Sequence, residues 1–182
     1  MNEQLPSDKM ALKLLSENGC SHRVINHCKA VEKVATEIAE ACKKKGLNVD
    51  VKLVQIGALL HDIGRSKTHN VDHAIVGAEI ARSLNLPEAV ISIIERHVGG
   101  GITVEEAKNL GWPAKSYVPE TLEEKIVTYA DKLIEGSERV SIEQTIKKFS
   151  RKLPPSSIAG MRKLHEEITL LVGDFNVGSR VA

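Results

Sequence analysis

The chain has 182 residues, enough for one domain with a sizeable buried core. Charged residues make up 27% and hydrophobic residues 42%, which excludes an intrinsically disordered chain, and the aromatic share of only 3% favours packed helices over a β-sandwich. The formal charge of +1 gives no overall field to attract nucleic acid, so we expect no nucleic-acid binding and a locally recognised ligand.

Targeting signals and disulfides are not expected. The sequence shows no secretory leader and no apolar run near the roughly 18 residues of a membrane span, so we predict a cytoplasmic protein without a membrane partner. Cys20, Cys28 and Cys42 are an odd set without CxxC spacing, which favours reduced thiols. We expect Cys28 to be a small buried residue and not a ligand.

Apolar residues recur every three or four positions through most of the chain, which predicts amphipathic helices. Single glycines and prolines between these stretches mark helix ends and starts. Thr103 with Glu106 and Thr121 with Glu124 have the spacing of capping boxes, so helices are expected to begin at both threonines. The other predicted helices cover about 21–45, 51–63, 71–84, 87–97, 142–149 and 156–172.

Six ionisable residues lie on the apolar sides of these helices or at their ends. The pair His61 and Asp62 falls in the last turn of the second helix, which Gly64 is expected to end. The other four come from four further helices. In chain order the six are His27, His61, Asp62, His73, His97 and Asp131.

These six residues predict a metal centre. A single inward histidine is more often a hydrogen-bonded core residue, but burying six ionisable groups costs about several kcal/mol each unless they are paired or bind a metal. Imidazoles and carboxylates without thiolates favour Fe, Mn, Co, Ni or Zn over Mg or Ca. Because Asp62 is able to bridge, we expect two divalent transition-metal ions.

Two later segments are given other roles. The segment 111–120, which contains Trp112 and Tyr117, is expected to be a loop over the mouth of the site. The amphipathic stripe of 156–172 is assigned to packing, either inside the chain or between subunits, so a homo-oligomer is an open alternative. His22, His69 and His165 are expected at the surface.

The string Ala58-Leu59-Leu60-His61-Asp62-Ile63-Gly64, preceded by His27 and followed by Asp131 in Tyr129-Ala130-Asp131-Lys132, resembles the signature of the HD-domain family. The resemblance covers about 20–136. It implies an all-α, single-domain helical bundle over 1–182. The HD core would occupy about 20–136, and additional C-terminal helices would form an extension over about 137–175.

The added histidines His73 and His97 resemble those of the two-metal subset of the family, which includes the bacterial HD-domain dinucleoside tetraphosphatases. The chain lacks the Gly-Tyr-Pro motif of the cyclic-di-GMP phosphodiesterases, so that substrate is not expected. The resemblance implies a metal-dependent phosphohydrolase that uses a metal-activated water on a nucleotide or small phosphorylated metabolite. It implies one ion held by His27, His61, Asp62 and Asp131, and another by Asp62, His73 and His97.

Three residues are candidates to contact the substrate phosphate. Arg65 offers a bidentate fork and Lys132 a point charge, and with Asp62 they form the expected catalytic group. Gly100, in the Gly99–Gly101 run, offers a backbone amide to an anion. Each has a plainer alternative, a solvated charge at a helix end for the first two and a helix-ending loop for the glycines.

Three other functions are compatible with the same residues. In a one-ion nucleotidase, His73 and His97 would bind the substrate phosphate instead of a second ion. In a regulatory module, the metal would be structural and a nucleotide would bind without turnover, although a structural site usually needs only four ligands. Oxygenase chemistry on a diiron site uses the same ligand types.

Overall fold

Short polar side chains set where most of the helices begin. Ser21 accepts a hydrogen bond from the amide of Val24 at the start of α2. Both predicted capping boxes are present, at the starts of α6 and α7. The computed structural model describes residues 4–175. Its elements are α1 (Asp8–Glu17), α2 (His22–Lys44), α3 (Val51–Leu60), a 3₁₀ turn (Ile63–Ser66), α4 (His73–Ser83), α5 (Glu88–Arg96), α6 (Val104–Asn109), α7 (Leu122–Lys132), β1 (Ile134–Glu135), β2 (Glu138–Arg139), α8 (Ile142–Phe149) and α9 (Pro155–Val172).

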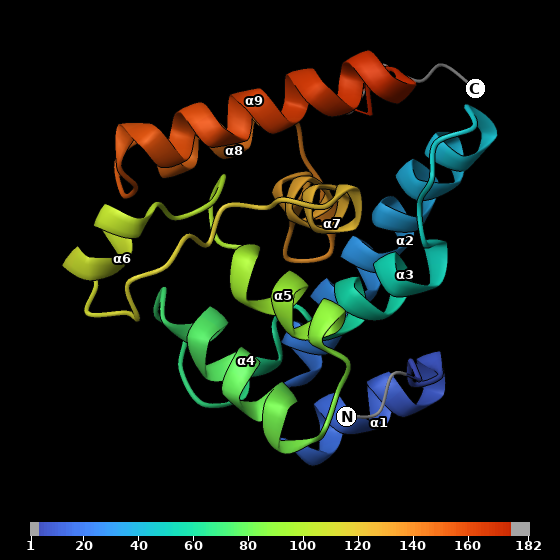
Figure 1. The fold of residues 1–182 in the computed structure, drawn as a ribbon, viewed down its shortest axis with the longest axis vertical. Coiled ribbons are helices and arrows are strands. Elements are labelled where there is room, and N and C mark those ends of the chain that lie inside the picture. Colours follow the sequence, from blue (N-terminus) through green and yellow to red (C-terminus); the bar gives the residue numbers. More distant parts are fainter. Residues whose placement is uncertain (1–3, 176–182) are drawn as a thin grey trace.

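Helix α7 lies at the centre of the bundle and is seen end-on in Figure 1. It packs against α2, α3 and α5, and α9 crosses above it. Apolar side chains of α2, α7 and α9, among them Ile38, Val127 and Leu164, meet in one buried cluster, and α1, α3, α4 and α5 share a second. The all-α prediction is confirmed, because strands within residues 4–175 amount to one two-stranded hairpin.

The second predicted helix ends earlier than expected. α3 stops at Leu60, and the chain continues through the 3₁₀ turn. The turn packs closely at Gly64, where a Cβ would lie 1.9 Å from the carbonyl oxygen of His73 and 2.6 Å from the amide nitrogen of Gly77. Gly64 therefore does not end α3 as a left-handed cap. Its missing side chain lets the turn lie directly against α4.

Two elements were not predicted. In α1, Ala11 and Leu15 are buried beside the apolar side chains of α3. The hairpin turns at Gly136, whose φ of +62° is a conformation that favours glycine. Each strand has only two residues, which is too short for alternating hydrophobicity to mark. The hairpin nevertheless places a backbone carbonyl of functional interest beside α2.

The segment 111–120 packs into the fold, contrary to the prediction that it covers the site. Trp112 and Tyr117 are 8% and 1% exposed and meet edge to face in a third buried cluster with Ala74 and Val98. Burying these large rings stabilises the segment where it lies. None of the described residues that line the cavity at the site comes from this segment.

The C-terminal helices complete the bundle. Met161 and Leu164 of α9 pack into the cluster around α7, which confirms the predicted packing role of its apolar stripe. His165, expected at the surface, is half-buried, and its Nδ1 lies 2.8 Å from the hydroxyl of Tyr129. Over the described residues, no helix combines the length and the apolarity that crossing a bilayer requires.

Candidate metal centre

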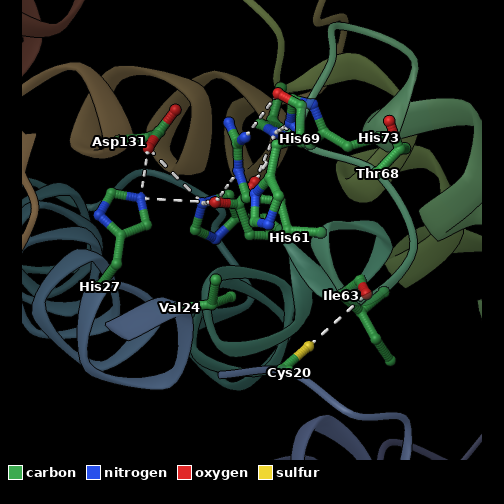
Figure 2. Close-up of polar contacts among 12 residues, drawn as sticks. Cys20, Val24, His27, His61, Ile63, Thr68, His69, His73 and Asp131 are labelled. Carbon is green, nitrogen blue, oxygen red and sulfur yellow. Dashed lines mark hydrogen bonds and ion pairs between the residues drawn. The ribbon is translucent and has the colours of Figure 1, made fainter. Parts of the chain in front are cut away.

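Six ionisable side chains converge on the inner side of α7 (Figure 2). Three of the histidines stand at helix ends: His73 begins α4, while His61 and His97 follow the last residues of α3 and α5 and contact carbonyls of the last turn that lack helical partners. The six are His27 of α2, His61 and Asp62 at the end of α3, His73 at the start of α4, His97 at the end of α5, and Asp131 in the last turn of α7.

Asp131 faces two imidazoles, and Asp62 lies within 4 Å of all four. The Nε2 atoms of His27 and His61 lie 3.0 and 3.5 Å from Oδ1 of Asp131. On the other side of the cluster, two further imidazole nitrogens lie 3.2 and 3.3 Å from Oδ1 of Asp62. Figure 2 shows His27 and Asp131 on one side of His61 and His73 on the other. The structure therefore brings all six predicted residues together.

All four imidazoles share one hydrogen-bonding pattern. In each ring Nδ1 lies against a backbone carbonyl oxygen, and because a carbonyl only accepts, Nδ1 must donate. In a neutral ring Nε2 then carries a lone pair, and it is Nε2 that points into the cluster. The Nδ1 atoms of His27, His61, His73 and His97 lie 2.8, 2.7, 2.6 and 2.6 Å from the carbonyl oxygens of Gly136, Ala58, Asn70 and Ile94.

Lone pairs and negative charges consequently face one another at the centre. The Nε2 atoms of His73 and His97 are 3.0 Å apart, although neither has a hydrogen left to donate in the neutral form. The buried atoms His61 Nε2 and Asp62 Oδ1 have no hydrogen bond of good geometry. Buried acceptors without donors cost free energy, and a bound cation removes that cost.

The donor set fits divalent metal ions. One ligand atom from each of His27, His61 and Asp131 lies within 4.8 Å of the others, and the same holds for His61, Asp62 and His97. The Nε2 of His73 adjoins the second group, 3.2 Å from the Asp62 oxygen. Imidazole and carboxylate ligands without thiolates suit first-row transition metals and Zn.

Charge interactions keep the two carboxylates ionised. Burial alone raises the pKa of Asp62, but the imidazoles of His61, His73 and His97 outweigh it and hold this pKa well below its usual range. For Asp131, burial is likewise outweighed, first by the charge of Lys132 and then by the contacts with the imidazoles of His27 and His61, so its pKa is also well below the usual range. Both side chains are therefore present as metal-binding anions.

His97 is correspondingly held neutral. Burial lowers the pKa of His97 to about 4, against the attraction of Asp62 and with the help of the neighbouring imidazoles. At neutral pH the ring of His97 therefore carries no proton on Nε2 that it could donate to Nε2 of His73. A metal ion is therefore the simpler way to satisfy the facing nitrogen atoms.

Arg65 lies at the edge of the centre. Its Nε donates to Oδ2 of Asp62 at 2.7 Å, and its Nη1 lies 3.4 Å from the carbonyl oxygen of His69. The side chain is 30% exposed and lines the adjoining cavity. The structure thus places Arg65 where it both contacts Asp62 and faces the cavity.

Lys132 points inward instead of into solvent. Its Nζ donates to Oδ2 of Asp131 at 2.5 Å and to the carbonyl oxygen of His97 at 3.2 Å, and its side chain is 8% exposed. The ammonium group therefore links two of the elements that carry the cluster. These contacts hold the ammonium group against Asp131, and the side chain also lines the cavity.

Gly100, whose amide was expected to contact an anion, does not line the cavity at the cluster. It is packed against α9, where a Cβ would come within 2.2 Å of the amide nitrogen of Met161. Its own amide donates to Oγ of Ser157 at 3.4 Å. The missing side chain thus serves helix packing, while the neighbouring Gly99 lines the cavity.

A cavity of about 410 Å³ opens onto the cluster, and a second hollow of about 410 Å³ adjoins it. The two share lining residues, among them His27, Arg65 and His69, so they form one entrance. Most charged side chains around this entrance are basic, which suits an anionic ligand. The basic residues are Arg23, Arg65, Lys132, Lys148 and Lys152, and the acidic residues are Asp62, Asp131 and Glu135.

Sequence reasoning missed the backbone and C-terminal contributions to the site. Every residue has a carbonyl, so no residue type marks Gly136 or Asn70 as a hydrogen-bond partner of an imidazole. The helix that forms the α8 wall of the cavity was predicted, but none of its residues was assigned to the site. Only the tertiary structure shows that its side chains line the cavity.

Comparisons with known proteins agree with this geometry. The family model described as the HD domain matches residues 24–136. An uncharacterized protein of Methanocaldococcus jannaschii is 52% identical over 164 residues, which cover 89% of this chain and 96% of that protein. A tRNA (cytidine(56)-2'-O)-methyltransferase of Picrophilus torridus is 42% identical over 169 residues, or 93% of this chain, but the chain spans only 48% of that relative.

A similarity to a solved structure is more distant. The HD domain of the Listeria monocytogenes phosphodiesterase PgpH, crystallised with cyclic-di-AMP, has a TM-score of 0.49 and 20% sequence identity. The similarity covers 95% of this chain and 99% of that domain.

Proposed function

The chain belongs to the HD-domain family, and we propose that it is an enzyme of the metal-dependent phosphohydrolase type. It would cleave a phosphoester or phosphoanhydride bond of a nucleotide or another small phosphorylated metabolite. One observation carries the proposal. Four imidazole nitrogens with bare lone pairs and two ionised carboxylates form one cluster, and His27, His73, His97 and Asp131 of that cluster line a cavity whose entrance is predominantly basic.

We propose that the six residues hold two divalent ions that share Asp62. When bound, such ions lower the pKa of a water molecule towards neutrality and stabilise charge on phosphate oxygens. Fe, Mn, Co, Ni and Zn all suit these ligands. The first ion would be held by His27, His61, Asp62 and Asp131, and the second by Asp62, His73 and His97.

The protein's own groups keep this ligand set in place. The backbone carbonyls hold the hydrogens on the four Nδ1 atoms, which fixes the tautomer and turns each Nε2 towards the centre. Lys132 orients Asp131, and Arg65 orients Asp62 while its guanidinium faces the cavity. We propose that Arg65 also binds a non-bridging phosphate oxygen of the substrate.

Metal content and hydrolysis test this function together. Protein reloaded separately with Mn, Fe(II), Co, Ni or Zn is assayed under reducing conditions against phosphomonoesters, cyclic and linear phosphodiesters and dinucleoside polyphosphates. We expect metal-dependent release of product with at least one class. Tight nucleotide binding without hydrolysis across the whole panel would instead support a regulatory module.

The number of ions separates the two-ion enzyme from the one-ion alternative. We expect about two metal equivalents in the wild-type protein and about one in His97→Ala, because His97 belongs to one of the two proposed ion sites. A single equivalent that His97→Ala leaves unchanged would assign His73 and His97 to phosphate binding.

A further inference from the structure

One wall of the cavity at the metal ligands comes from the C-terminal extension. The family model ends at residue 136, yet α8 and the turn after it contribute a row of lining residues. They are spaced as i, i+3, i+4, i+7 and i+8, so they share one helical face. The turn preserves that face, because the amides of residues 152 and 153 both donate to the carbonyl of Phe149. The row is Thr145, Lys148, Phe149, Lys152 and Leu153.

The apolar part of this wall includes one aromatic ring, that of Phe149. Phe149 is half-buried on the main core and also lines the cavity, and Leu153 follows it by one turn. Met161 of α9 and Ile134 of β1 line the same cavity. An apolar surface with one aromatic ring, facing a group of metal ligands across a single cavity, suits a ligand that is apolar and planar at one end and anionic at the other.

The charged part of the wall lies beside the ring. Lys148 is 46% exposed, forms an ion pair with Glu135, and places its Nζ 6.0 Å from the centre of the Phe149 ring. Lys152, one turn further on, is exposed at the same entrance. Two ammonium groups next to an aromatic surface suit a ligand whose planar group carries phosphate nearby.

We infer that the α8 wall is the binding site for the nucleobase of the substrate, with Phe149 as the residue that determines specificity for a base-bearing phosphate. The inference rests on the proposed function, since the metal ligands would hold the phosphate. The cavity of about 410 Å³ lies in the range of roughly 300–1,000 Å³ for small-molecule sites, which suits one nucleotide unit. The base stacks on Phe149 and contacts Leu153 and Met161, and Lys148 and Lys152 face its phosphates.

Binding of matched ligands tests this without turnover. The probes are the phosphonate analogue of AMP, in which a methylene replaces the ester oxygen, and the corresponding analogue of ribose 5-phosphate, which lacks the base. Calorimetry on metal-loaded wild-type protein should give tighter binding of the AMP analogue. Phe149→Ala should weaken it about tenfold, the size of one lost base–aromatic stack, and change the base-free analogue by less than about twofold.

Control variants separate stacking from loss of the fold. Phe149→Leu keeps an apolar side chain in the core and should lose most of the preference for the base, whereas Phe149→Tyr should keep it. Lys148→Ala should weaken both analogues, and Lys147→Ala, the exposed neighbour that does not line the cavity, should weaken neither. Thermal unfolding of every variant confirms that the comparison is made between folded proteins.

The nucleotide unit has two sources, a free nucleotide or the end of a single strand. A short phosphorothioate-linked oligoadenylate tests which source applies. If it binds more tightly than the AMP analogue, and Lys152→Ala removes this extra affinity, the ligand is the end of a single strand. If it binds equally or more weakly, the ligand is a free nucleotide. Equal affinity of wild-type protein for the two analogues, or an unchanged preference in Phe149→Ala, overturns the inference. If metal uptake and hydrolysis persist in that case, the proposed function survives, and if they are absent, the proposed function fails separately.

Discussion

Two groups of buried carboxylates lie on neighbouring helices of this molecule and differ in what faces them. Glu95 of α5 binds Lys115 Nζ at 2.7 Å and Arg82 Nη2 at 3.2 Å. Glu124 of α7 binds Arg96 Nη1 at 2.9 Å and also accepts from the amide of Glu120 at 2.7 Å. In this ion-pair network each carboxylate faces cations or amide donors that the protein itself provides.

The metal-ligand cluster, only a few residues further along the same two helices, lacks such internal balance at its centre. Oδ1 of Asp62 faces imidazole nitrogens whose hydrogens are engaged by carbonyls on the opposite side of each ring. A network that supplies its own cations stabilises a fold, whereas one that presents only acceptors is organised to bind a cation from solution. The groups that face buried carboxylates therefore distinguish the ion-pair network, which stabilises the fold, from the cluster that is suited to bind a metal.

The largest effect is expected from a change inside the metal-ligand cluster. Asp62→Asn removes the shared carboxylate, so we expect loss of bound metal and a fall in hydrolysis of more than about 100-fold, beyond the roughly 10–100-fold typical of residues around a ligand. Metal analysis and kcat/KM measure this. In wild-type protein, metal at a hundredfold excess over its Kd should add about 2.7 kcal/mol to the free energy of unfolding, and this gain should vanish in the variant.

The matching change in the ion-pair network should act on stability alone. Glu124→Gln leaves the guanidinium of Arg96, which is 18% exposed, with Glu120 as its remaining ion-pair partner, so we expect a loss of about 3 kcal/mol in the free energy of unfolding. Chemical denaturation measures this loss. Metal content should stay at the wild-type level, and a loss of metal in Glu124→Gln would mean that the two groups are not separate.

Lys132 has a feature of each region. It is a cation that the protein itself provides, as in the ion-pair network, but it contacts Asp131 of the metal-ligand cluster. Lys132→Met should lower metal affinity about tenfold by releasing Asp131 from its donor. A positioning role predicts that excess metal restores much of kcat with little change in KM. A large rise in KM at saturating metal would instead assign Lys132 to the substrate phosphate.

The smallest expected effects distinguish two glycines. Gly64→Ala pushes a Cβ against the backbone of α4 and should cost about 1–3 kcal/mol of stability and also displace His73, which lowers metal retention. Gly57→Ala is the matched control, because its Cβ would crowd only the side chain of Ile93, with Cδ1 at 2.5 Å. It should lower stability without altering metal content, as thermal unfolding and metal analysis would show.

Much of the candidate site could be predicted from the sequence because charged groups on apolar helical faces are costly and therefore conspicuous. That signal selects His27, His73, His97 and the His61-Asp62 pair, and the fold brings them together with Asp131. The same reasoning predicted the helix starts at Thr103 and Thr121, since a capping box is a local hydrogen-bond pattern. Local patterns of this kind do not depend on the rest of the fold.

The sequence alone thus determined the helical architecture, the residues of the cluster and their chemical type, because periodicity and burial of charge are properties of short segments. Only the tertiary structure decided that Gly64 lets the 3₁₀ turn pack against α4, that Lys132 points inward, and that one face of α8 lines the cavity. These features depend on contacts between residues far apart in the chain. Such contacts form only when separate elements pack together, and no local spacing encodes them.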